Sequence, residues 1–180
     1  MTGQIPVYCA HKNTGRPATD ETYMHIDDIE QGAFQTSVGN TSFHFDAGYT
    51  PQFPLGYGLS YVNFEYTNIR LNSRQLRPGD ILYVSADLTN HGAVEAEEVA
   101  QLYIRDLVGS VTRPVKELVG FTRVMLKPGE TKTVEFSLTT DDLSFYDRNL
   151  KFVAEPGEFH AWIGGSSATD LRAEFELLTE

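Results

Sequence analysis

Hydrophobic and polar residues alternate along most of the chain from Ile81 onward, a pattern typical of strands with one buried face. In the clearest case, Leu82, Val84, Ala86 and Leu88 fall on one side of an extended segment. The same alternation marks Ala100 to Ile104, Val134 to Leu138, Phe159 to Ile163 and Phe175 to Leu177, and further strands are expected at Phe64 to Leu71 and Leu118 to Leu126. The pattern predicts about seven strands.

Three predicted strands follow the same pattern of proline, glycine and an acidic residue, namely Pro78-Gly79-Asp80, Pro128-Gly129-Glu130 and Pro156-Gly157-Glu158. Proline presets a negative φ and glycine accepts the positive φ that must follow, so each pattern predicts a type II turn. No segment shows convincing helical periodicity. Short strands separated by turns therefore predict an all-β fold, an antiparallel β-sandwich.

Residues 1 to about 55 differ from the rest because they show no sustained periodicity. Polar, Gly- and Asn-rich pieces alternate there with isolated aromatic residues such as Tyr8, Tyr23, Phe34 and Phe53. Long segments without regular structure are uncommon inside compact domains, and a free linker would be poorer in aromatic residues. We therefore expect a long, mostly irregular N-terminal arm that lies against the sandwich or a neighbouring chain.

The composition excludes several classes of partner. The net charge of −11 opposes the phosphate contacts on which nucleic-acid binding depends, and anionic membranes are equally unfavourable. The longest apolar runs are only a few residues, too short to cross a bilayer. The single cysteine, Cys9, cannot form an internal disulfide, and the first residues lack the features of a signal peptide. The sequence therefore leaves the compartment undecided.

Several motifs resemble glycoside hydrolase family 3. The run Phe53-Pro54-Leu55-Gly56-Tyr57-Gly58-Leu59-Ser60-Tyr61 resembles the joint that enters the C-terminal fibronectin type III-like domain of that family. Further similar segments follow in the family's order, at Gln101 to Ile104, Ser110 to Phe121, Leu126 to Glu130 and Glu155 to Phe159. Upstream, Gly3 to Tyr8 and His11 to Pro17 resemble the stretch that leaves the family's α/β catalytic domain. The resemblance covers essentially the whole chain.

This resemblance implies a C-terminal fragment of a β-glucosidase or β-xylosidase. Residues 1–55 would be an irregular linker arm from the end of a catalytic domain, and residues 56–180 an immunoglobulin/fibronectin type III-like β-sandwich. The parent enzyme would hydrolyse terminal β-linked glucose or xylose with retention, would need no redox cofactor, and would be periplasmic or secreted. Its catalytic domains would be the partners of this chain, and a homodimer is a further option.

The residues themselves offer no catalytic, cofactor or metal site. The adjacent carboxylates Asp27-Asp28 and Asp141-Asp142 point to opposite faces if extended, so neither pair makes the convergent dyad that a retaining glycosidase needs. Asp is also common in turns, which is the simpler interpretation of both pairs. The histidines are scattered without metal-ligand spacing. We therefore expect the chain to be inactive alone.

A few residues are candidates for an interface or a sugar contact. Trp162 alternates with inward residues and should lie on the outer face of its strand, where it could stack on a sugar, although cover by the arm or a partner domain is the favoured interpretation. The other candidates, in the arm, are His11, Lys12, Asn13 and Arg16, which could edge a substrate entrance or belong to a plain surface loop. Three functions follow: an accessory domain of a family 3 glycosidase, which the motifs favour, a carbohydrate-binding module, or an independent protein-interaction module.

Overall fold

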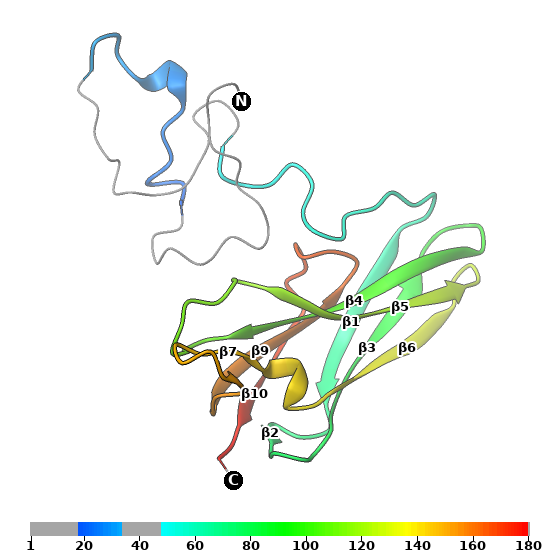
Figure 1. The fold of residues 1–180 in the computed structure, drawn as a ribbon. Helices are drawn as coiled ribbons and strands as arrows, with labels where there is room; N and C mark the ends of the chain where they lie inside the picture. Colours follow the sequence, from blue (N-terminus) through cyan, green and yellow to red (C-terminus); the bar gives the residue numbers. More distant parts are fainter. Residues whose placement is uncertain (1–17, 34–47, 180) are drawn as a thin grey trace.

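The computed structural model describes residues 18–33 and 48–179, and most of this part is a β-sandwich (Figure 1). Seven of its described strands have six or more residues: β1 (Phe64–Leu71), β3 (Leu82–Asn90), β4 (Ala96–Asp106), β5 (Glu117–Leu126), β6 (Thr131–Leu138), β9 (Gly157–Gly164) and β10 (Arg172–Leu177). Two-residue strands are β2 (Gln75–Leu76), β7 (Phe145–Tyr146) and β8 (Phe152–Val153). The predicted all-β sandwich is confirmed.

Two sheets face each other in this sandwich. One has three strands in the order β1-β3-β6, and the other has five in the order β2-β10-β9-β4-β5, while β7 and β8 form a separate small hairpin. All pairs are antiparallel except the short parallel pair of β2 with β10. Only two short 3-10 turns accompany the strands in the described part, η1 (Ile26–Asp28) and η3 (Asp141–Leu143), and it contains no helix of a length and apolarity that would cross a membrane.

The alternating positions form the core between the two sheets. In β3, Leu82, Val84, Ala86 and Leu88 are all buried, whereas their neighbours on the other side are not. They meet Ala100, Leu102, Ile104, Phe159, Ala161, Ile163 and Phe175 of the five-stranded sheet. Burial of these apolar side chains is the main stabilising term of the domain. The inward residues of each strand were therefore predictable from the alternation alone.

The proline-glycine turns are confirmed at two places of three. Gly79 has φ of 87° and Asp80 N–H donates to Arg77 O (3.0 Å), and the second turn repeats this with Gly129 at 71°. The prediction was wrong for Pro156-Gly157-Glu158. Gly157 has φ of 158° and is already the first residue of β9, so these three residues begin a strand where a type II turn was predicted.

The described part of the N-terminal arm has little regular structure. Tyr49 O–H donates to Asp20 Oδ1 (2.5 Å) and the Tyr23 and Tyr49 rings lie 5.8 Å apart, so residues 18–33 and the chain around Tyr49 contact each other. Figure 1 shows residues 18–33 away from the sandwich, whereas the chain just before β1 approaches it. Within the described part of the arm, the section that approaches the sandwich is therefore the last one.

Candidate functional site

Residues 53–62, which we call the joint, connect the arm to β1. Tyr57 N–H donates to Pro54 O (3.0 Å) and Gly56 has φ of 78°, so the joint turns sharply at Gly56. These are the features of a type II turn, in which glycine takes the position with positive φ. The turn presents the carbonyl oxygens of Leu55 and Gly56 to the outer face of the five-stranded sheet.

Gln101, on the outer face of β4, binds this turn through its side chain. Its Nε2 donates to Gly56 O (3.1 Å) and to Gly165 O (2.7 Å), and the residue is only 5% exposed. A Cβ at Gly56 would lie 1.9 Å from Gln101 Oε1. Glycine is therefore needed at position 56 both for its backbone conformation and for the close approach of Gln101.

Tyr103, two residues further along β4, completes the contact. Its hydroxyl lies 2.6 Å from Gln101 Oε1 and 3.1 Å from Leu55 O, so its single proton can serve either acceptor. Leu55 O also accepts from Ser167 N–H (2.8 Å). Tyr103 is completely buried. Buried polar groups are stable only when hydrogen-bonded, and here each is bonded to the joint or to its neighbour.

Lys116 and Trp162 support the loop that supplies Ser167. Lys116 Nζ donates to Ser167 O (2.9 Å) and to Thr169 O (2.7 Å), and it lies 4.7 Å from the centre of the Trp162 ring. Such a cation over an aromatic face is attractive. The register pairs Trp162 with Tyr103, so the two side chains share the outer face.

The position of Trp162 bears on the carbohydrate-binding alternative. The residue is only 7% exposed; Lys116 Nζ lies over its ring, and the ring of His160 packs against it edge-on, 5.4 Å between centroids. A sugar that stacks on an aromatic ring needs an open face of that ring. The structure therefore provides no specific observation in favour of sugar stacking at Trp162, and its part in an interface stays a prediction.

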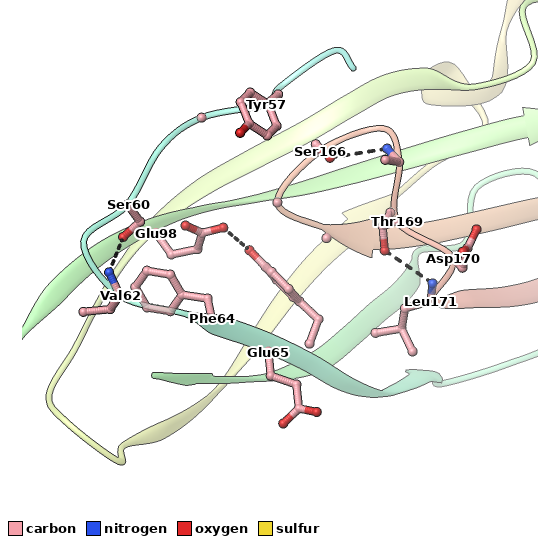
Figure 2. A pocket seen from close by; sticks show the side chains of 15 residues that line it. Tyr57, Ser60, Val62, Phe64, Glu65, Glu98, Ser166, Thr169, Asp170 and Leu171 are labelled. Atoms are coloured by element: carbon pink, nitrogen blue, oxygen red, sulfur yellow. Dashed lines mark hydrogen bonds between the residues drawn. The ribbon is translucent and has the colours of Figure 1, made fainter. Parts of the chain in front are cut away.

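A groove of about 610 Å³ lies between the joint and the loop that follows β9, as Figure 2 shows. Tyr57, Ser60 and Phe64 line it on one side, and residues 164–166 and 168–171 on the other. Its lining contains three carboxylates, of Glu65, Glu98 and Asp170, and no lysine or arginine. By charge it suits a cationic group better than an anion.

At the base of this groove, Tyr66 and Glu98 connect the two sheets. Tyr66 O–H donates to Glu98 Oε1 (3.1 Å). Burial raises the pKa of Glu98, and burial together with the nearby carboxylate raises the pKa of Tyr66 well above its usual range. The pair thus favours a neutral phenol that donates across the sandwich, which is a structural tie between β1 and β4.

The adjacent carboxylates stand apart from this groove. Asp141 and Asp142 begin η3, where Asp142 Oδ2 accepts from Thr139 N–H (2.7 Å) and from Thr139 Oγ1 (2.8 Å). Asp27 belongs to η1, and its carboxylate lies 3.4 Å from His25 Nδ1. Both pairs occupy short turns, as the turn interpretation predicted. Within residues 18–33 and 48–179, no three His, Cys, Asp or Glu side chains are gathered as metal ligands would be.

His11, Lys12, Asn13 and Arg16 lie outside the described residues, so their predicted role is not addressed by the structure. Conversely, Gln101 and Tyr103, which hold the joint, were not among the residues predicted from the sequence. Their spacing of two residues already places both on one face of β4. What no pattern indicated was that residues 55, 56, 165 and 167 meet on that face.

The fold and the joint define a class of protein, a fibronectin type III-like domain with an N-terminal connecting segment. A family model described as fibronectin type III-like domain matches residues 98–167. The chain is 40% identical over 98% of its length to a periplasmic β-glucosidase of Salmonella typhimurium, and 46% identical over 67% of its length to a β-xylosidase of Formosa agariphila. These matches cover 21% and 17% of the two relatives.

Solved structures agree with this. The β-glucosidase of Listeria innocua in complex with isofagomine superposes with a TM-score of 0.80 and 38% identity over 99% of this chain and 23% of that one. The chain thus spans about a fifth of the length of the relatives it matches, their C-terminal part. It belongs to the C-terminal, fibronectin type III-like region of glycoside hydrolase family 3 β-glucosidases and β-xylosidases.

Proposed function

We propose that this chain is the non-catalytic accessory region of a family 3 glycosidase, and that it holds the catalytic part in a fixed orientation through the joint. One observation carries the proposal. Two consecutive backbone carbonyls, of Leu55 and Gly56, are bound by groups buried in the sandwich. A flexible tether would need no such contacts, because a linker that only connects domains leaves its backbone to water.

The domain division that we propose places the linker arm at residues 1–55 and the sandwich at residues 56–180. The hydrogen bonds of Leu55 and Gly56 support a boundary at this point, since within residues 18–33 and 48–179 the chain first hydrogen-bonds to the sandwich there. We also propose that His11, Lys12, Asn13 and Arg16 contact the catalytic part or its sugar ligand, in line with their donor-rich side chains.

For the whole enzyme we propose hydrolysis of terminal β-linked glucose or xylose with retention. The names of the relatives support this, since they include β-glucosidases and β-xylosidases. The Salmonella relative is called periplasmic, which supports a periplasmic or secreted enzyme here. A homodimer of the enzyme is a further part of the proposal that a molar mass measurement would test.

The experiment is a comparison of the 180-residue chain with a chimera in which it replaces the matching C-terminal part of the Salmonella enzyme. Both are assayed with an aryl β-glucoside at equal concentration. We expect no turnover by the chain and turnover close to that of the Salmonella enzyme by the chimera. Reproducible turnover by the pure chain, or a folded chimera without activity, would contradict the proposal.

A further inference from the structure

The outer face of the five-stranded sheet carries apolar side chains that remain open to solvent. Val99, Leu118, Phe121 and Met125, which we call the β5 stripe, are all exposed, and Phe121 has 69% of its surface free. Single exposed apolar residues are ordinary on protein surfaces, but contiguous ones mark an interaction site. Whether these four are contiguous depends on the strand register.

The register brings the β5 stripe together. Phe121 lies opposite Gln101, Met125 opposite Glu97, and Val99 opposite Arg123, between them on the neighbouring strand. Diagonal neighbours on one face of an antiparallel pair lie about 7–8 Å apart, within reach of large side chains. The β5 stripe is therefore one surface along the last two strands of the sheet.

The same register makes the β5 stripe continuous with the joint. Phe121 is the cross-strand partner of Gln101, which binds Gly56, and Leu118 is the partner of Tyr103, which contacts Leu55. A hollow of about 590 Å³ lies here, and its lining combines Leu55 of the joint and apolar residues such as Leu118 and Phe145 with four charged residues, Arg113, Lys116, Glu117 and Asp142. The chain thus passes from the sandwich into the arm at the border of this apolar surface.

β5 is also the last strand of its sheet. A ten-residue edge strand with exposed apolar side chains invites association, and natural proteins normally cover such edges or place charges on them. Between Phe121 and Met125 of the β5 stripe lies Arg123, whose charge is paired with that of Glu97. The edge is therefore one that the folded protein is expected to cover.

We propose that the β5 stripe is the surface against which the catalytic part of the same polypeptide packs. This inference rests on the proposed function and names the contact surface that accompanies the joint. We choose the catalytic part as the occupant because the polypeptide chain connects it directly to this face. The segment leading to the catalytic part leaves the sandwich beside Phe121, so the part it leads to reaches this face at high effective concentration. A second copy of the chain has no such advantage.

The test uses the chimera and the 180-residue chain, each with Phe121→Asp and, as matched control, Tyr83→Asp. Tyr83 is also an exposed aromatic residue, 41% free, but lies on the outer face of the three-stranded sheet. We expect amide hydrogen exchange in β5 to be at least tenfold slower in the chimera than in the chain. Phe121→Asp should remove this protection and lower the melting temperature of the chimera, but not that of the chain, whereas Tyr83→Asp should leave both unchanged.

Equal exchange in chimera and chain, or equal effects of the two substitutions in an active chimera, would overturn this inference and leave the proposed function intact. Protection that rises with the concentration of the isolated chain would assign the β5 stripe to a second copy and overturn it too. A folded chimera without activity would instead contradict the proposed function, and this inference with it.

Discussion

The two outer faces of the sandwich come from the same alternating pattern but have different surroundings. On the three-stranded sheet, Arg70 donates to both oxygens of Asp87 (2.8 and 2.9 Å), and the pair stays open to solvent. On the five-stranded sheet, Gln101, Tyr103 and Trp162 occupy equivalent outward positions and are buried. Arg70 and Asp87 on the first face have water as an alternative partner, whereas Gln101 and Tyr103 on the second do not.

This difference in solvent access indicates which of the two faces depends on its polar contacts. An exposed ion pair contributes little to stability because water screens it and competes for its groups. A buried amide that loses its partners costs the full price of desolvation. Substitutions in the buried contact between the joint and β4 should therefore have large effects, and equivalent ones on the outer face of the three-stranded sheet small effects, which three predictions can test.

The largest effect is expected for Gly56→Val. The substitution combines an unfavourable positive φ with a Cβ 1.9 Å from Gln101 Oε1, and Gln101 can retreat only by breaking its bonds to Gly56 and Gly165. Together these should cost about 2–4 kcal/mol. The loss should appear either in the free energy of unfolding or, if the joint detaches from β4, in the free energy of that local contact. Urea unfolding and exchange of the Ser167 amide measure the two outcomes.

Gly58→Ala is the matched control, because a Cβ there meets nothing within 4 Å and the residue has no positive φ. It should change the free energy of unfolding by less than about 0.5 kcal/mol. Equal losses for the two variants would show that the contact with Gln101 is unimportant.

A smaller loss is expected for Gln101→Leu, which keeps the approximate volume but removes both donors. The carbonyls of Gly56 and Gly165 would lose a partner in a covered site, at about 1–3 kcal/mol. Thr133→Val makes the equivalent change on the open face, where Thr133 Oγ1 donates to Asp87 (2.9 Å), and should cost less than about 0.5 kcal/mol. Urea midpoints that fall equally in both variants would remove the distinction between the faces.

The smallest effect is expected for Asp87→Asn and depends on pH. Hydrogen bonds from Arg70, Asn68 and Thr133 hold the pKa of Asp87 well below its usual 3.8. A depressed carboxyl pKa stabilises the folded state above the unfolded pKa, and this contribution disappears as the pH falls through the folded pKa. The wild type should thus be slightly more stable than the variant at neutral pH, with the gap closing below about pH 4. A gap in urea midpoint that stays constant down to about pH 2 would contradict this.

Much of the fold could be predicted from the sequence, and the site only partly. The inward row of β3 and the turns at Gly79 and Gly129 are local properties of a few neighbouring residues, so the chain encodes them directly. The prediction of a turn at Gly157 was wrong, because the same three residue types can also begin a strand. The glycines of the joint indicated its position in the sequence, but nothing in the sequence indicated that Gln101 and Tyr103 bind it.

The reason lies in what alternation encodes. It determines that Ala100, Leu102 and Ile104 face one side of β4 and Gln101 and Tyr103 the other, and nothing more. In the structure, both sides of this stretch are buried. Leu55 and Gly56 of the joint and Gly165 and Ser167 after β9 are more than forty positions from Tyr103 or Gln101 along the chain. Only the folded chain brings these residues together. Residues close in sequence therefore set the inner face of the domain, whereas contacts between distant residues decide that the joint covers the part of one outer face around Gln101 and Tyr103.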